Sequence, residues 1–262
     1  EQLWQEVQAT AFVAHSYQWP VIGWESDIKN WTKEDLENYF HTYYAPNNCV
    51  VVISGDVKLN EVKKLAEKYF EPIPAGPKPR PLHTIEPEQT GEKRLFIKRE
   101  VPSPYIMLAY HVPQSGSENY YALNSIVDNQ QLALEVGSIY SDAFDPTLFF
   151  FYGIANDGVT ASQLEKAILD EVDKIIKEGI NDSELQKVKN QKLMSFYKTT
   201  ETINGMSNTI GTYELFFGDY KKMFSAPDNY KKVSAEDIKK VAAKYFTKQN
   251  RTVGILNTEE AQ

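Results

Sequence analysis

Residues 28–56 read I-K-N-W-T-K-E-D-L-E-N-Y-F-H-T-Y-Y-A-P-N-N-C-V-V-V-I-S-G-D, and a diverged copy of this stretch occupies residues 230–255. Thr32 corresponds to Ser234, 202 positions further along, and the same offset holds without a gap from Trp31/Val233 to Ile53/Ile255. Two capped helix–turn–strand segments could resemble each other by chance, but chance would rarely preserve both the register and the turn length. The sequence therefore indicates an internal duplication.

Each copy has the pattern of a helix, a turn and a buried strand. A hydroxyl residue followed three positions later by an aspartate, Thr32/Asp35 and Ser234/Asp237, is a capping box that begins a helix. Apolar residues then recur at helical spacing, at Leu36, Tyr39, Phe40 and Tyr43 in the first copy and at Ile238, Val241, Ala242 and Tyr245 in the second. Polar turns precede β-branched runs at 50–53 and 252–255, which predict strands. We expect the two copies to have matching burial, with Leu36 facing a sheet.

The duplication also predicts that the chain opens inside its first unit. A helical stretch is expected from about 183 to 213, and its counterpart would end within residues 1–12. We therefore expect residues 1–12 to be the tail of a long helix, with roughly a hundred residues of the first unit missing before Glu1. On this interpretation residues 1–71 are the C-terminal part of a first α+β unit, residues 72–92 are a linker, and residues 93–262 are a second, homologous unit.

Prolines and hydrophobic patterns predict the remaining organisation. Six of the 13 prolines lie between Pro72 and Pro87, a density that bars helix and central strand and indicates an extended linker. A further helix is expected at 56–70. The second unit reads as strands at 94–99, 105–111, 132–140 and 147–155, helices at 118–126, 161–177, 183–213 and 235–245, and a final strand. At Ile126–Asp128 a helix runs almost directly into the next strand, through a short loop or because residues are missing there. The order predicts an α+β fold, a duplicated unit of a mainly antiparallel sheet covered by helices on one face, with the first unit incomplete.

Composition excludes several classes of function. The net charge of −8 and the isoelectric point near 5.2 argue against nucleic acid as a partner. No apolar run approaches the ~18 residues that a membrane span needs, and no signal peptide is visible. The single cysteine, Cys49, lies in a predicted strand and is interpreted as a small core residue rather than a nucleophile. The compartment stays open, with bacterial periplasm and cytoplasm both compatible.

The residues that most often carry chemistry form no recognisable set. The four histidines, His15, His41, His83 and His111, include no pair in an H-x-x-E-H or H-x-x-x-H arrangement, so no helical zinc pair is predicted. No nucleophile elbow and no glycine-rich phosphate loop occurs. Acidic pairs such as Glu34/Asp35 are explained by their place at a helix N-terminus. The residues alone predict no catalytic, cofactor-binding or metal-binding side chain.

Two stretches carry a family resemblance. H-S-Y-Q-W-P-V-I-G-W-E-S-D-I-K-N-W-T-K-E-D-L at 15–36 and Y-Y-A-P-N-N-C-V-V-V-I-S-G-D-V at 43–57 resemble the characteristic run of the pitrilysin/insulinase-type zinc metallopeptidases. L-A-L-E-V-G-S-I-Y-S-D-A-F-D-P-T-L-F at 132–149 and the helix at 184–197 are also similar, so the resemblance covers nearly the whole chain. It implies tandem homologous α+β units, as in pitrilysin and the mitochondrial processing peptidases, with zinc bound by H-x-x-E-H and a downstream glutamate in the first unit. All three ligands would lie in the part missing before Glu1.

The resemblance further implies that the second unit is non-catalytic and closes over peptide substrates. Some family members use an Arg and a Tyr in that unit to hold substrate; alignment on Q-Q-L-A-L (130–134) places these positions at Val127 and Leu134, so the pair is not present. Three interpretations remain. The chain is the non-catalytic portion of a zinc metalloendopeptidase, inactive alone; or a wholly non-catalytic family member that acts as a partner or scaffold subunit; or an unrelated α+β binding module. An intact H-x-x-E-H upstream would decide between the first two.

Overall fold

The structure is a computed structural model that describes residues 1–126 and 136–258. The helices are α1 (Gln2–Ala11), α2 (Glu25–Asn30), α3 (Lys33–Tyr43), α4 (Leu59–Tyr69), α5 (Tyr120–Ile126), α6 (Ala161–Glu178), α7 (Asp182–Glu201), α8 (Ile203–Phe217), α9 (Ala226–Lys232) and α10 (Ala235–Tyr245). The strands are β1 (Lys93–Lys98), β2 (Tyr105–Val112), β3 (Val136–Tyr140), β4 (Thr147–Ile154) and β5 (Arg251–Asn257). Short 3-10 helices lie at Ser16–Gln18, Pro46–Asn48 and Tyr220–Ser225. None of the described helices is long and apolar enough to cross a membrane.

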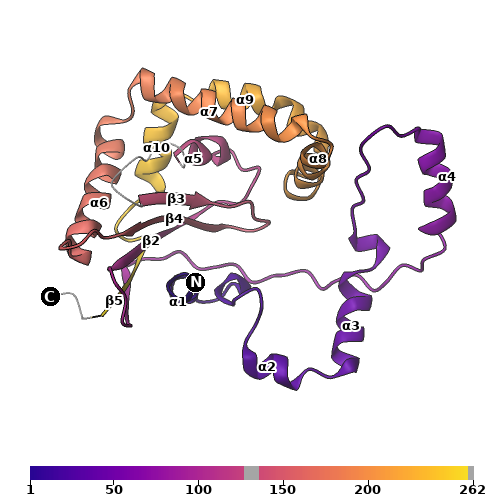
Figure 1. The fold of residues 1–262 in the computed structure, drawn as a ribbon, viewed down its shortest axis with the longest axis horizontal. Helices are drawn as coiled ribbons and strands as arrows, with labels where there is room; N and C mark the ends of the chain where they lie inside the picture. The colour runs from indigo at the N-terminus through magenta and orange to yellow at the C-terminus, as the bar shows by residue number, and fades with distance from the viewer. Residues whose placement is uncertain (127–135, 259–262) are drawn as a thin grey trace. The chain divides into compact units, whose positions relative to one another are not determined.

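The described residues fall into two compact groups (Figure 1). The first, called here the sheet group, comprises Glu1–Pro20, Thr84–Ser195 and Ser225–Gln262. The second, the helical group, comprises Val21–His83 and Phe196–Phe224. Membership does not follow chain order, because α1 belongs to the group that contains the second sequence copy and α8 to the group that contains the first. The boundaries at 71 and 92 stay predictions about the repeated units.

The sheet group is built on a five-stranded sheet with the order β1-β5-β2-β4-β3. β1 runs parallel to β5, with Lys93 opposite Thr252, and the other neighbouring pairs are antiparallel. The predicted α+β class with a mainly antiparallel sheet is confirmed. Residues 127–135, which include part of the strand predicted at 132–140 and the irregular junction at 126–128, lie outside the described residues.

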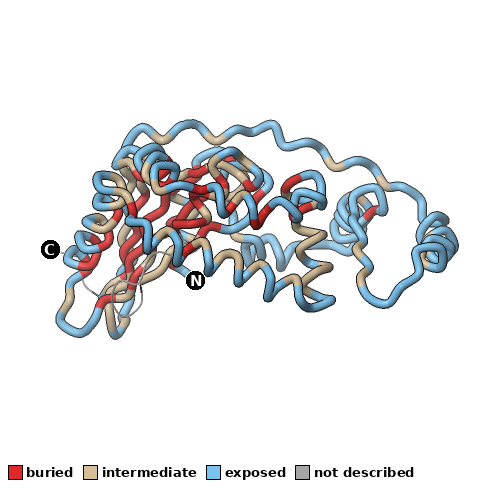
Figure 2. The backbone as a smooth tube through the Cα atoms, turned by 90° about the horizontal axis from the view of Figure 1, so that it is seen from above, coloured by how far each residue is buried: buried red, intermediate tan, exposed pale blue. Residues whose placement is uncertain are grey.

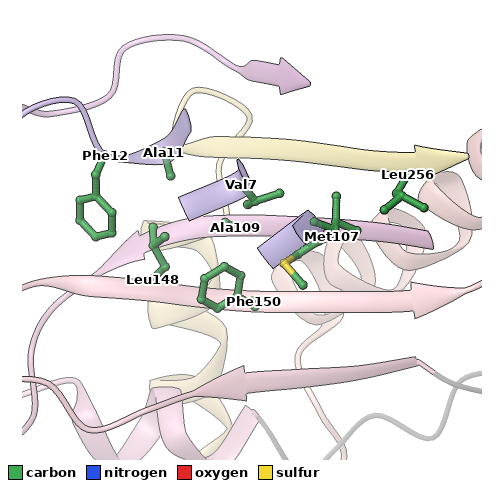
Figure 3. Packing of buried hydrophobic residues seen from close by; sticks show 9 residues of the cluster. Val7, Ala11, Phe12, Met107, Ala109, Leu148, Phe150 and Leu256 are labelled. Carbon is green, nitrogen blue, oxygen red and sulfur yellow. The ribbon is translucent and has the colours of Figure 1, made fainter. Parts of the chain in front are cut away.

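Both faces of the sheet are apolar, and helices cover both of them (Figure 1). Successive side chains of a strand point to opposite faces. On one face α10 and α6 contact β2, and Phe246 packs against the rings of Tyr110, Phe149 and Phe151. On the other face α1 crosses the sheet (Figure 3), and its buried side chains join those of the strands: Leu3, Val7, Ala11 and Phe12 with Met107, Ala109, Leu148, Phe150 and Leu256. The structure thus has a helix, α1, on the second face of the sheet, whereas the sequence predicted helices on one face only.

The helical group contains the first copy, and here the prediction of matching burial is wrong. Helix α3 forms with the expected capping box of Thr32 and Asp35. Residues 49–54, however, form no strand, and Leu36 is 53% exposed whereas its counterpart Ile238 is 1% exposed. The physical reason is that a strand needs neighbouring strands, and none of the described strands lies in this group. Figure 2 shows the consequence, since residues 21–83 are almost entirely exposed while the sheet group holds a buried core.

Smaller differences concern the helices. The stretch predicted as continuous from 183 to 213 is divided at Thr202, whose side chain caps α8 by accepting a hydrogen bond from the backbone N–H of Gly205 at 3.0 Å. Helix α9, which the sequence did not predict, corresponds at the 202-residue offset to α2, so the duplication extends further than the sequence pattern indicated. The helix predicted at 56–70 forms as α4, and residues 74–90 have neither helix nor strand, as their prolines require.

Candidate functional site

Two of the four histidines come together beside the C-terminal end of α1. His15 is buried, and the rings of His15 and His111 lie 6.0 Å and 5.1 Å from the ring of Phe12. Nδ1 of His15 accepts a hydrogen bond from the backbone N–H of Tyr17 at 3.2 Å, and its Nε2 lies 3.5 Å from the Asp145 carboxylate. His41 and His83 are exposed and lie in the helical group. The four histidines are thus divided between the two groups, two in each.

Hydrogen bonds to one carboxylate hold the chain segment just after α1 in place. The Glu86 carboxylate accepts hydrogen bonds from three successive backbone N–H groups, those of Val13, Ala14 and His15, at 2.7, 2.9 and 2.8 Å. Burial alone would raise the pKa of Glu86, but these donors outweigh it and the pKa lies below its usual value. No local pattern in the sequence points to this contact, because more than 70 residues separate its partners.

Lys93 and His111 complete the same arrangement by satisfying carbonyls at the end of α1. The Lys93 ammonium donates to the carbonyls of Thr10 and Ala11 at 2.9 and 2.7 Å, and Nε2 of His111 lies 3.2 Å from the Ala11 carbonyl. These carbonyls have no partner within the helix, and cations are favourable there. Burial lowers the pKa of His111, and burial also lowers that of Lys93 although Glu86 opposes it. The roles visible here are structural: they hold α1 on the sheet.

A second polar cluster joins β1, β5 and α6. The Glu92 carboxylate pairs with Arg251, whose Nε donates at 2.7 Å, and with Arg94 at 2.9 Å. Arg94 also donates to Glu165, which is buried on α6. Burial raises the pKa of the nearby Tyr110 to about 12, so this phenol stays protonated at neutral pH. Glu165 is the buried carboxylate of this cluster and its charge is paired with that of Arg94, which is the condition for tolerating buried charge.

A cavity lies on the α1 face of the sheet, near the first turn of that helix. It has a volume of about 410 Å³ and is lined mainly by apolar and aromatic side chains, among them Leu3, Trp4, Tyr105, Met107, Tyr152 and Ile154. Trp4 stacks on Phe150 at 4.0 Å, which fixes one wall. Such a cavity suits an apolar group rather than a metal ion. No sequence motif marks these residues, although apolar side chains on both faces of β2 (Y-I-M-L-A-Y-H-V) indicate a second covered face.

The neighbouring strand β3 offers backbone groups close to this cavity. Among the described strands it pairs with β4 alone, with Gly137 opposite Tyr152 and Val136 opposite Gly153. A Cβ atom at Gly137 would lie 2.5 Å from the Tyr152 hydroxyl oxygen, so the glycine is what lets this phenol lie across β3. Val127 and Leu134, the positions aligned with the substrate-holding pair of some zinc peptidases, lie outside the described residues.

Within residues 1–126 and 136–258, no three histidine, cysteine, aspartate or glutamate side chains are grouped so that they could hold a metal ion. The fold and this site define an α+β unit whose described polar clusters brace the sheet and whose cavity is apolar. A model of the family described as Peptidase M16 inactive domain matches residues 30–192. The chain belongs to this family.

Similar proteins agree with this assignment. The chain is 28% identical over 269 residues to zinc protease PqqE of Helicobacter pylori, covering 94% of this chain and 60% of that protein. It is 26% identical to the uncharacterized zinc protease YmxG of Bacillus subtilis, covering 89% and 60%, and 21% identical to the mitochondrial-processing peptidase subunit beta of Lentinula edodes, covering 94% and 59%. The chain thus spans about 60% of the length of these relatives.

Solved structures show the same fold. A protease from Helicobacter pylori superposes with a TM-score of 0.91 at 25% identity, covering 98% of this chain and 66% of that one. A peptidase M16 inactive domain from Pseudomonas fluorescens gives a TM-score of 0.87 at 15% identity, covering 100% and 66%, and supports the fold alone. The recognised resemblance to zinc metallopeptidases of this type is confirmed.

Proposed function

We propose that this chain is the non-catalytic portion of a zinc-dependent metalloendopeptidase and that it helps to enclose and bind peptide substrates. The observation that carries the proposal is the match of 163 residues, 30–192, to the inactive domain of a peptidase family. The two histidines near α1 support the proposal, because a ring nitrogen of His15 and one of His111 already contact backbone groups at or just after the end of that helix. Zinc would be bound in an upstream part of the catalytic unit, by residues that this chain does not contain.

The cavity and β3 suggest how a peptide would be held. An extended peptide can add to a sheet edge through main-chain hydrogen bonds, while pockets accept its side chains. Here β3 lies beside β4, and Ile154 and Tyr152 of β4 line the 410 Å³ cavity. A backbone paired with β3 could thus place an apolar side chain over Gly137 and into the cavity.

Two measurements test the proposal. Metal analysis and a fluorogenic peptide assay, with and without chelator, should show no stoichiometric zinc and no cleavage by the purified chain, since catalytic zinc needs three converging ligands and an open position. Fluorescence polarisation with a labelled 15-residue peptide of mixed sequence should show binding. Ile154→Asp, which places a charge in the cavity, should weaken binding about tenfold, equivalent to ~1.4 kcal/mol. Thr147→Asp, at the other end of β4, is the matched control. Chelator-sensitive cleavage, or equal effects of the two variants, would contradict the proposal.

A second function has one observation in its favour. The chain is similar to mitochondrial-processing peptidase beta subunits, which are by name parts of an assembly. On this alternative the whole protein is non-catalytic and acts as a partner or scaffold subunit beside a catalytic chain. Reading the encoded sequence upstream of Glu1 distinguishes the two, because an intact H-x-x-E-H favours the peptidase and its absence favours the partner subunit.

A further inference from the structure

A second hollow lies among the helices of the sheet group, between α5, α9 and α10. It has a volume of about 260 Å³, and its lining comes from residues 118–122 and 229–241. Helix α10 contacts α5, and α5 contacts α9 (Figure 1). All of these residues belong to the sheet group. The hollow is therefore framed by one set of packed helices.

Apolar side chains form the inner surface of this hollow. Ala122, Val233 and Val241 line it and are only 6%, 6% and 3% exposed. The ring of Tyr121 also lines it and is held edge-on against the ring of Tyr230, with the two ring centroids 4.9 Å apart. A concave apolar surface of this size suits small aliphatic groups of a ligand, which gain free energy when they leave water.

Charged side chains also line the hollow, and two of them balance each other. The Asp237 carboxylate accepts hydrogen bonds from the backbone N–H and the hydroxyl of Ser234 at 2.8 and 2.6 Å. These bonds lower the pKa of Asp237, and the nearby charge of Lys240 lowers it further. Lys240 therefore already has an anion near it, and the first turn of α10 is satisfied by its own cap.

Glu118 and Lys232 are the uncommitted charges of this hollow. Both line it and are exposed, and within residues 1–126 and 136–258 neither forms an ion pair. The neighbouring Lys231 differs, because its ammonium pairs with Asp228 at 3.2 Å. The hollow thus offers a ligand one free carboxylate, from the segment before α5, and one free ammonium, from the end of α9.

A ligand with both signs of charge suits this pair of side chains. A simple anion would pair with Lys232 and be repelled by Glu118, and a simple cation would meet the reverse. A short peptide with free termini has an ammonium at one end and a carboxylate at the other. Asn119 adds a hydrogen-bond acceptor for a peptide N–H, because its amide nitrogen donates to the Tyr245 hydroxyl at 3.0 Å and its carbonyl oxygen remains available.

We propose that this hollow binds short zwitterionic peptides, of two or three residues with free termini and small aliphatic side chains. The peptide carboxylate pairs with Lys232, its ammonium pairs with Glu118, and its side chains cover Val233 and Val241. The hollow shares no lining residue with the apolar cavity beside β3. The inference therefore does not rest on the proposed enclosure of substrates.

Isothermal titration calorimetry of the 262-residue chain with the dipeptide alanyl-leucine, at neutral pH and low salt, tests this assignment. Alanyl-leucine should bind saturably, whereas N-acetyl-alanyl-leucine and alanyl-leucinamide, which each lack one charge, should bind about tenfold more weakly. Lys232→Gln should weaken the binding of alanyl-leucine about tenfold and leave that of alanyl-leucinamide unchanged. Glu118→Gln should weaken the binding of alanyl-leucine and leave that of the N-acetyl form unchanged. Lys231→Gln, beside the site, is the matched control and should bind alanyl-leucine as the unsubstituted chain does.

Four results would overturn the assignment. One is the absence of saturable binding of alanyl-leucine up to about 10 mM. Another is equal affinity for the N-acetyl form, which would mean that the hollow accepts any carboxylate. An equal loss in Lys231→Gln would mean general attraction by positive charge, and binding that survives both site variants but is lost in Ile154→Asp would place the dipeptide in the cavity beside β3. None of these readouts uses cleavage or the 15-residue peptide, so this inference and the proposed function can fail separately.

Discussion

The two equivalent positions Leu36 and Ile238 should respond very differently to truncation. Both lie on the apolar stripe of a capped helix, on α3 and α10, and both would have been given the same cost from sequence alone. In the structure Ile238 is 1% exposed and Leu36 is 53% exposed. Replacing Ile238 by alanine removes three buried carbons, about 2.4 kcal/mol of transfer free energy at ~0.8 kcal/mol each, and leaves a cavity that adds to it.

We therefore expect Ile238→Ala to lower the free energy of unfolding by about 2–5 kcal/mol, and Leu36→Ala to change it by less than about 0.5 kcal/mol. Urea denaturation followed by circular dichroism and by tryptophan fluorescence measures both. Trp4, stacked on Phe150, reports on the sheet group, and Trp31 reports on the helical group. Equal costs for the two variants would refute the burial that the structure assigns to α3, and a silent Ile238→Ala would refute the packing of α10.

Three further outcomes follow from single contacts. The pKa of Glu86 is lowered in the folded chain, so the ionised carboxylate stabilises the fold. This stabilisation should be complete above the ordinary glutamate pKa of ~4.3 and be lost as the pH falls below that value. Glu86→Gln should flatten that part of a thermal-melt pH profile. Ser234→Ala should cost ~1 kcal/mol in a urea melt through loss of the cap, with Ser234→Thr as the conservative control. Gly254→Ala should cost ~1–3 kcal/mol by overpacking, and shortening Val7 to alanine in the same chain should recover part of it.

The sequence predicted those features that depend on neighbours along the chain. The capping boxes at Thr32 and Ser234, the amphipathic helices and the alternating strands are all encoded within a few residues of where they form, and the structure has them. Its prediction of burial in the first copy is wrong, because burial of Leu36 or Ile53 depends on strands elsewhere. A periodic pattern records which face could be buried and not whether a partner is present.

Contacts between segments that are distant in sequence were the second feature that could not be predicted. The three backbone donors that meet Glu86 lie more than 70 residues away in sequence, and neither segment has a periodicity that points to the other. The cavity beside Trp4 was likewise missed, since it forms only when α1 lies against β2 and Trp4 stacks on Phe150 of β4. Unbroken apolar character along β2 was the available signal, because a strand with one solvent-facing side would alternate.

The exchange of helices between the copies makes a last outcome testable: cutting the linker should not release the first copy. At the 202-residue offset α1 corresponds to the start of α8, yet α1 packs on the sheet of residues 93–257 through Leu3, Val7 and Phe12. Lys93 and Glu86 add hydrogen bonds on both sides of that helix end. A specific protease site placed after Arg80 should therefore give two pieces that co-elute in size-exclusion chromatography without denaturant. Val7→Asp puts a charge at a fully buried position and should let them separate after the same cut. Separation of the unsubstituted pieces would mean that α1 does not hold the first copy to the sheet.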